Sequence, residues 1–272
     1  MGLNMNNAFN MDCVLGMKQL KDNCIDLTIT SPPYDNIRNY NGFSFDWHET
    51  IRQLYRITKE GGVVVWIVSD QTIDGNETGT SFKQALFAKE CGFNLHDTMI
   101  WKKESCAFPE TTRYYQVFEY MFVWSKGKPK TFNPLIDRKN YYAGCKVHGT
   151  DRQIDGSTTR VNAEKHGGRD VKYYGYRFNV WEISSEKNNK TGHPAVFPLR
   201  LVKDHILTWS NEHDTVLDPF LGSGTTRIAS WDLNREFIGY EISKEYFEKQ
   251  EERFKDHTNQ IDMFHDLGEV VS

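Results

Sequence analysis

Apolar and polar positions along the chain predict strands and helices in turn. Ile25, Leu27 and Ile29 occupy every second position of a β-branched stretch, which predicts a strand over 25–30. The run 61–70 is continuously apolar and of strand length, which is typical of a strand covered on both faces. Further strands are expected near residue 9 and at 95–103, 117–127, 214–220 and 235–243, the second and third of these as a hairpin.

Helical spacing predicts the other elements. Over 47–62, Trp47, Ile51 and Leu54 share one side, and the pair Gly61-Gly62 indicates a C-terminal stop. Further helices are expected at 14–23, 81–93, 198–210, 224–234 and 244–256. Alternating strands and helices indicate an α/β fold with a mostly parallel sheet and helices on both faces.

One segment departs from this alternation. Residues 129–190 are basic, rich in Gly and Tyr, and without long periodicity, which predicts an insertion of long loops. The expected organisation is therefore a first half of the main domain at 1–128, an insertion at 129–190 and a second half at 191–272.

Composition is ordinary for a globular protein of 272 residues. The sequence has no run of 18 apolar residues, and its start has no basic flank followed by an apolar stretch, so neither a membrane span nor a secretory signal is expected. The five cysteines are widely spaced, without a Cys-x-x-Cys pair, which argues against a zinc site and for reduced thiols in the cytoplasm, and no metal is expected.

The net charge of −4 argues against a nucleic-acid partner, but its distribution changes the picture. Residues 101–200 contain 18 Lys and Arg against 10 Asp and Glu, a net charge of +8, so the remainder carries −12. A basic segment on an acidic chain is a candidate contact surface for an anionic polymer. The alternative is a solvated, charge-rich insertion.

The first candidate motif is Thr30-Ser31-Pro32-Pro33-Tyr34, directly after a predicted strand. Neither proline offers an N–H, so the sheet ladder cannot continue. The strand therefore ends in a stiff tip that presents a hydroxyl group and an aromatic ring. Taken alone, this motif also fits a polyproline turn or a peptide ligand.

The second motif, DPFLGSGTT, follows another predicted strand and begins a helix. Gly222 and Gly224 allow a sharp turn close to a ligand, and Glu241, at the end of the next strand, is placed to accept hydrogen bonds from ribose hydroxyls. Asp218 before the turn suits a cationic amine. These features fit S-adenosyl-L-methionine, although an ordinary strand–helix connection is the alternative.

Together, the TSPPY and DPFLGSGTT motifs and the following GYE resemble the amino-group DNA methyltransferases, with the order of the beta class. The resemblance covers nearly all of 9–250 except the insertion, and it implies a Rossmann-like sheet. It also extends to a segment containing Asp12, expected near the cofactor adenine, and to KTGHPAVFP (190–198), expected near its methionine end. The implied cofactor-binding residues are Asp12, Thr30, His193, Phe197, Asp218, Pro219, Phe220, Gly222, Ser223, Gly224, Thr225, Thr226 and Glu241.

The methyl transfer that this resemblance implies explains why the strand ends in a stiff, polar tip. The Ser31 hydroxyl and the Pro32 carbonyl can accept both N–H bonds of an exocyclic amine and turn its lone pair toward the sulfonium methyl, while Pro33 stiffens the loop. The target base must flip out of the duplex, and Tyr34 offers a stacking surface. Methylation of cytosine carbon 5 is excluded, because that route needs a catalytic cysteine and the chain contains no Pro-Cys.

The resemblance implies target recognition by the insertion. Candidate DNA-binding residues are Tyr34, Arg113, Lys126, Lys128, Lys130, Arg138, Lys139, Arg160, Lys165, Arg169 and Lys172. The insertion tyrosines either stack on bases or anchor loops, and anchoring is favoured. His193 either contacts the ligand or makes a structural hydrogen bond, and Asp70 either lines the site or caps the next helix.

The sequence thus predicts a sequence-specific DNA methyltransferase acting on cytosine N4, with adenine N6 as the alternative. An RNA or protein amide methyltransferase is disfavoured by the motif order, and a non-catalytic DNA-binding regulator by the intact motifs. Double-stranded DNA is the expected partner. A cognate restriction endonuclease and a homodimer are further expectations from the resemblance.

Overall fold

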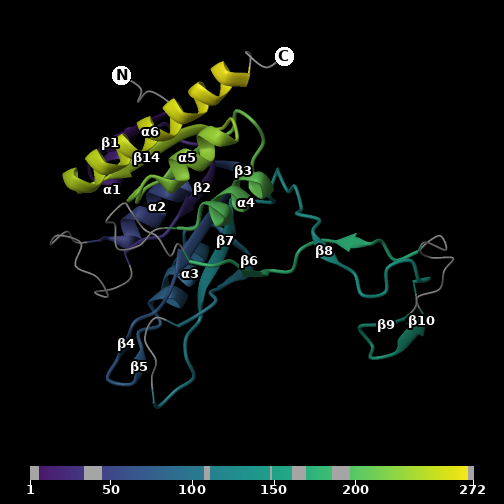
Figure 1. The fold of residues 1–272 in the computed structure, drawn as a ribbon. Helices are drawn as coiled ribbons and strands as arrows, with labels where there is room; N and C mark the ends of the chain where they lie inside the picture. Colours follow the sequence, from purple (N-terminus) through teal and green to yellow (C-terminus); the bar gives the residue numbers. More distant parts are fainter. Residues whose placement is uncertain are drawn as a thin grey trace. The chain divides into compact units, whose positions relative to one another are not determined.

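The computed structural model of the protein describes residues 6–33, 45–106, 111–147, 149–160, 170–185 and 197–268, with only the backbone at 160 and 260–268 (Figure 1). The chain forms two compact units. Unit 1 comprises Met1–Asn133 and Asn179–Ser272, and unit 2 comprises Pro134–Phe178.

Unit 1 is built on a sheet of eight strands in the order β1-β14-β13-β2-β3-β7-β6-β12. All neighbours pair in parallel except β7, which is antiparallel to both β3 and β6. Their bounds are β1 (Asn7–Asn10), β2 (Ile25–Thr30), β3 (Thr58–Val68), β6 (Asn94–Lys102), β7 (Phe118–Ser125), β12 (Val180–Glu182), β13 (Thr215–Asp218) and β14 (Glu236–Glu241).

Helices cover both faces of this sheet (Figure 1). One group packs together as α1 (Cys13–Met17), α2 (Trp47–Ile57) and α3 (Thr80–Glu90), and the other as α4 (Leu199–Trp209), α5 (Thr225–Asp232) and α6 (Lys244–Gly268). In β3, Val64 and Trp66 join the core beneath the first group, while the equally buried Val63 and Val65 alternate to the other face. The predicted mostly parallel α/β fold is confirmed, as are the hairpin-related strands β6 and β7.

The expected glycine stop of the helix at 47–62 is wrong. Helix α2 ends at Ile57, and Gly61 and Gly62 lie inside β3 at an irregularity in its pairing with β2. Gly61 adopts φ +79°, and a Cβ there would lie 2.8 Å from the Cβ of Lys130. The glycine is therefore required by a bulge in β3 that packs against a neighbouring loop. This is a tertiary contact, and the spacing of apolar residues in a helix cannot predict it.

Unit 2 contains only short strands among its described residues. β8 (Arg138–Lys139) pairs with β11 (Tyr174–Gly175), and β9 (Thr150–Arg152) pairs with β10 (Thr158–Arg160). Although it lies within the segment 129–190, β12 belongs to unit 1, where it pairs with β6 and buries Trp181. The predicted division into a catalytic half at 1–128, a target-recognition insertion at 129–190 and a cofactor-binding half at 191–272 stays a prediction.

Two properties of the described residues bear on the sequence analysis. None of the helices in the described ranges has the length and apolar character needed to cross a membrane. The five cysteines are free thiols.

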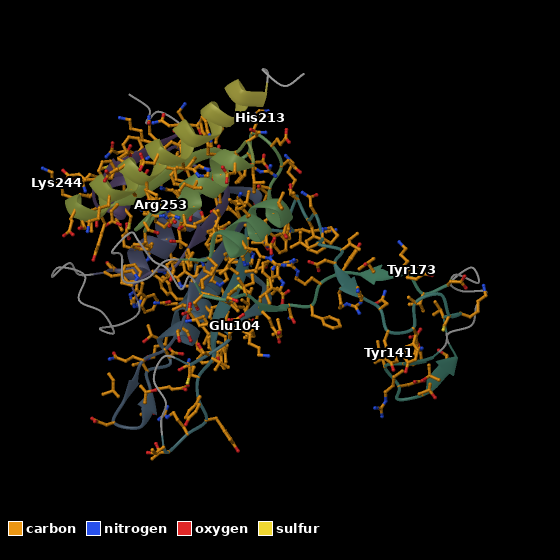
Figure 2. All side chains as sticks on the ribbon, viewed as in Figure 1. Glu104, Tyr141, Tyr173, His213, Lys244 and Arg253 are labelled. Atoms are coloured by element: carbon orange, nitrogen blue, oxygen red, sulfur yellow. The ribbon has the colours of Figure 1, made fainter. Side chains whose placement is uncertain are left out.

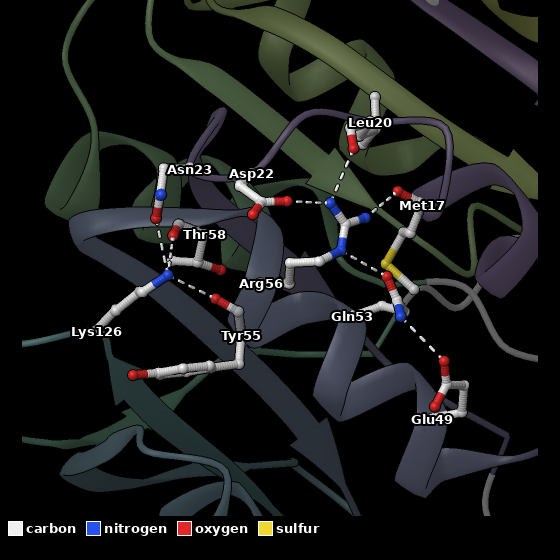
Figure 3. Close-up of polar contacts among 10 residues, drawn as sticks. All are labelled: Met17, Leu20, Asp22, Asn23, Glu49, Gln53, Tyr55, Arg56, Thr58 and Lys126. Carbon is white, nitrogen blue, oxygen red and sulfur yellow. Dashed lines mark hydrogen bonds and ion pairs between the residues drawn. The ribbon is translucent and has the colours of Figure 1, made fainter.

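Arg56 ties α2 to the segment that follows α1 (Figure 3). Its guanidinium donates to the carbonyl oxygens of Met17 at 2.7 Å and Leu20 at 2.9 Å, to the Asp22 carboxylate at 2.5 Å and to Gln53 Oε1 at 2.9 Å. The Met17 carbonyl is at the last residue of α1 and the Leu20 carbonyl lies just beyond it, and a helix of this length leaves its C-terminal carbonyls without partners inside the helix. The guanidinium therefore stabilises the α1 segment as well as α2.

We expect Arg56→Met to lower the free energy of unfolding by about 2–3 kcal/mol, because it removes charged hydrogen bonds to backbone carbonyls. Arg52→Met is the matched control, since Arg52 is 54% exposed and lies 3.6 Å from Glu49 on the same helix. Urea denaturation measures both. An equal, small effect of the two substitutions would contradict the role of Arg56.

Candidate active site

The tip of the first motif extends from β2 at the carboxyl edge of the sheet. β2 lies between β13 and β3 and is buried along most of its length. Ser31 and Pro33 are half-buried and Pro32 is buried. Thr30 Oγ1 donates a buried hydrogen bond of 2.7 Å to Asp218 Oδ1, so the start of this tip is joined to the second motif. Tyr34 lies outside the described residues.

The Asp218 carboxyl group accepts hydrogen bonds from three segments. Besides Thr30, the Thr226 hydroxyl donates to its Oδ2 at 2.7 Å and the Phe220 N–H donates to its Oδ1 at 3.1 Å. Burial raises the pKa of Asp218 to about 6, against an ordinary value of 3.8, and the hydrogen bonds from Thr226, Thr30 and Phe220 partly offset this shift. Asp218 was predicted to meet a cofactor amine. The structure gives it internal donors, and the predicted contact stays a prediction.

The glycine loop after β13 is held by the next strand. Gly222 and Gly224 have φ of +53° and +79°, conformations that other residues rarely adopt, and Gly224 is the N-cap of α5. The Gly222 N–H donates to Glu241 Oε2 at 2.9 Å, and the Ser243 N–H donates to Oε1 at 2.8 Å. Burial raises the pKa of Glu241.

The end of β1 lies beside Glu241. Asn10 pairs with Glu241 across the two strands, and its side-chain amide donates to the Glu241 carbonyl at 2.8 Å. Asp12, two residues after Asn10, caps α1, because its Oδ1 accepts the Leu15 N–H at 2.9 Å. The carboxyl ends of β1, β14, β13 and β2 therefore bring the predicted residues Asp12, Glu241, Asp218 and Ser31 to one edge of the sheet.

The remaining predicted cofactor residues fall into three groups. Pro219, Ser223, Thr225 and Thr226 are buried in the loop and the start of α5. Phe220 packs edge-on against Phe45, with ring centroids 5.0 Å apart, and Phe197 is half-buried just before α4. His193 lies outside the described residues.

This edge fits S-adenosyl-L-methionine in its chemistry. The half-buried Glu241 carboxylate is an acceptor suited to ribose hydroxyls, and the positive-φ glycine turn leads into a helix N-terminus. Within the described ranges, no group of three or more His, Cys, Asp or Glu side chains is arranged to hold a metal ion. The cofactor contacts of individual residues stay predictions.

Several predicted DNA-binding residues of unit 1 serve the fold. Lys126 Nζ donates to Asn23 Oδ1 and to the Tyr55 and Thr58 carbonyls at 2.8–3.1 Å (Figure 3). Because β7 runs antiparallel to β3, Lys126 and the exposed Lys128 and Lys130 follow the end of β7 at the sheet edge opposite Ser31. This placement does not favour their predicted role.

Arg113 is likewise engaged within unit 1. It donates to Thr72 Oγ1 at 2.9 Å and to the Gly75 carbonyl at 2.8 Å, and these contacts brace the hairpin of β4 (Thr72–Ile73) and β5 (Asn76–Glu77). Asp70 caps α3, since it accepts the Ser81 N–H at 2.9 Å. The capping alternative for Asp70 is therefore the one that the structure supports.

Unit 2 carries the other predicted DNA-binding residues. Lys139 and Lys172 are exposed, and Arg138 stacks over the Phe178 ring at 4.3 Å. Lys165, Arg169 and the Arg160 side chain lie outside the described residues. Tyr141 and Tyr173 are 93% and 72% exposed (Figure 2), which does not favour the expected anchoring of loops by these two rings.

Arg253 in α6 is not among the predicted site residues, yet it donates to the Ser223 carbonyl in the glycine loop at 2.8 Å. No motif signals this residue, because it follows the loop by 30 positions on a helix whose pattern only indicates one apolar side.

The raised pKa of Asp218 predicts a pH-dependent contribution to stability. The folded protein binds the proton of the Asp218 carboxyl group more tightly than the unfolded chain does. The stabilisation that comes from this proton is therefore complete below about pH 4 and is lost as pH rises through about 6. We expect the free energy of unfolding of the unmodified protein to fall by up to about 3 kcal/mol more than that of Asp218→Asn between pH 4 and 7. Urea denaturation without cofactor measures this difference, with the exposed Asp74→Asn as control. Parallel pH profiles for Asp218→Asn and the unmodified protein would contradict it.

Comparisons with known proteins agree with this geometry. The family model described as DNA methylase, of the N6 and N4 amino-methyltransferases, matches residues 25–252. The orphan methyltransferase M.BamHII of Bacillus amyloliquefaciens is 54% identical over 250 residues, which cover 89% of this chain and 93% of that protein.

Two solved structures extend the likeness to the fold. The crystal structure of the M1.HpyAVI-SAM complex is 26% identical, has a TM-score of 0.59, and is matched over 91% of this chain and 98% of its own. The PvuII DNA methyltransferase, described as cytosine-N4-specific, has a TM-score of 0.64 over 96% of this chain and 93% of its own, and at 19% identity it supports the fold alone. Since the family model spans most of the sequence, the chain belongs to the DNA methylase family of N6 and N4 amino-methyltransferases.

Proposed function

We propose that this S-adenosyl-L-methionine-dependent DNA methyltransferase recognises a specific sequence and methylates the N4 amine of a flipped cytosine. Membership of the amino-methyltransferase family establishes the enzyme class, the DNA substrate and the methyl donor. The observation that carries the proposal is the buried hydrogen bond of 2.7 Å between Thr30 and Asp218, which joins the start of the catalytic tip to the loop predicted to bind the cofactor.

The tip is suited to activate an exocyclic amine. Such an amine is a poor nucleophile because its lone pair is delocalised into the ring. We assign the Ser31 hydroxyl and the Pro32 carbonyl as acceptors for its two N–H bonds, which makes the nitrogen more tetrahedral. The bound cofactor supplies an electrophilic methyl group on its sulfonium. Positioning of the two reactants provides much of the rate acceleration.

The surroundings of the tip support accurate positioning. Thr30 is fully buried and hydrogen-bonded, Pro32 is buried, and two consecutive prolines restrict the backbone that presents the carbonyl. A base within a duplex cannot reach such a site, so we propose that it flips out at a cost of a few kcal/mol and stacks on Tyr34.

We propose unit 2 as the target-recognition part. It presents the basic side chains of Lys139 and Lys172 together with the exposed rings of Tyr141 and Tyr173 (Figure 2), a combination suited to phosphates and bases. The relative M.BamHII is named an orphan methyltransferase, which favours an enzyme without a cognate endonuclease. A cytoplasmic location and a homodimer remain further proposals.

Adenine N6 is the second candidate target. The matching family model covers both N6 and N4 enzymes, and both amines need the same pair of acceptors. Ser31 in place of an aspartate at the tip is the feature that favours cytosine, by resemblance to the N4 enzymes.

We expect the purified enzyme, incubated with S-adenosyl-L-methionine and unmethylated duplex DNA, to yield N4-methylcytosine. Digestion of the DNA to nucleosides followed by mass spectrometry identifies the product directly. Recovery of N6-methyladenine would select the second candidate, whereas methyl label in RNA or protein alone would refute a DNA substrate.

Ser31→Ala should lower the methylation rate by roughly 10²–10³-fold, because one of two groups that polarise the amine is lost. Binding of S-adenosyl-L-methionine, measured by calorimetry, should be retained. Ser69→Ala is the matched control, since Ser69 follows the neighbouring strand β3 at the same edge. Undiminished turnover in Ser31→Ala would remove Ser31 from the mechanism.

A further inference from the structure

The C-terminal helix α6 contacts the glycine loop through the side chain of Arg253. Arg253 Nη1 donates to the Ser223 carbonyl at 2.8 Å, and it lies 3.0 Å from Thr225 Oγ1 and 3.3 Å from Ser223 Oγ. One guanidinium nitrogen thus faces three oxygen atoms of the loop. Hydrogen bonds that involve a charged donor are roughly twice as strong as neutral ones.

The same helix fits closely against the turn. Gln250 is almost fully buried, and a Cβ placed on Gly224 would lie 3.1 Å from the Gln250 Cβ. With its φ of +79°, Gly224 is therefore constrained both by its own backbone and by α6. Helix α6 therefore packs directly against the turn at Gly224.

Contacts away from the loop already hold α6 in place. Arg227 in α5 pairs with Glu251 at 2.5 Å and lies over the Phe254 ring at 4.0 Å. His257 contacts the Asp232 carboxylate at 2.6 Å. These contacts dock α6 against α5 and so hold Arg253 beside the loop.

We propose that Arg253 is a positioning residue that fixes the conformation of the 222–225 loop and thereby sets the affinity for S-adenosyl-L-methionine. This inference rests on the proposed cofactor role of the loop. The Ser223 carbonyl lies between two glycines of positive φ, a turn that is costly to order. By bonding this carbonyl and Thr225, Arg253 maintains the turn before the cofactor arrives, which reduces the ordering cost of binding.

The test is calorimetric binding of S-adenosyl-L-methionine to full-length variants, together with steady-state kinetics on duplex DNA. We expect Arg253→Gln to raise the Kd and the KM for S-adenosyl-L-methionine by about tenfold or more, with kcat at saturating cofactor unchanged. Arg253→Lys keeps the charge but loses the planar guanidinium group, so its Kd should lie between those of the unmodified protein and Arg253→Gln. Glu251→Gln is the matched control: it weakens the contact between α5 and α6 without touching the loop, and its Kd should not change.

Three outcomes would overturn the proposal. The first is an unchanged Kd in folded Arg253→Gln. The second is a rise in the Kd of Glu251→Gln equal to that of Arg253→Gln. The third is a lower kcat of Arg253→Gln at saturating cofactor with an unchanged Kd. If Arg253→Gln does not fold, Arg253→Lys decides in the same way. Glu241→Gln separates this inference from the cofactor site itself: if it weakens binding and Arg253→Gln does not, only the positioning role fails. If neither variant weakens binding, the proposed cofactor site fails as well.

Discussion

A single buried carboxyl group, that of Asp218, joins the two motifs of this enzyme. It accepts hydrogen bonds from the hydroxyls of Thr30 and Thr226, residues at the start of the catalytic tip and of α5. Separation of the two motifs would remove the Thr30 hydrogen bond from this buried carboxyl group and leave it only the Thr226 and Phe220 donors of its own motif, which costs about 1–3 kcal/mol if nothing replaces the lost hydrogen bond. The geometry of the site therefore depends on this group more than on any surface contact.

The sheet explains how residues 188 positions apart come to share that contact. The catalytic strand β2 is near the start of the chain and the cofactor strand β13 is near its end, yet they are neighbours in a parallel sheet. Because parallel strands end at the same edge, the tip after β2, the glycine loop after β13 and Glu241 at the end of β14 lie side by side. The order of the motifs along the chain can thus change while the site keeps its composition.

Much of this arrangement was predictable, because strand and helix periodicity are local and both motifs follow strands. Hydrogen bonds between distant residues leave no such signal, which is why Thr30 and Thr226 were predicted as cofactor ligands without their contact to Asp218, and Arg253 was missed. Lys126 was proposed for DNA because it is basic, but antiparallel β7 carries it to the opposite edge. Gly61 resembled a helix stop because a bulge and a helix terminus both need positive φ.

The central claim concerns two reactants held at one edge of the sheet. A crystal structure of the enzyme with a non-transferring analogue of S-adenosyl-L-methionine and its DNA tests it most directly. The account predicts the analogue at the loop of Gly222 and Gly224, with the exocyclic nitrogen of the flipped base about 3–3.5 Å from the position of the methyl group and its N–H groups directed at Ser31 and Pro32. An analogue bound away from this loop, or a flipped base whose amine does not reach Ser31, would contradict it.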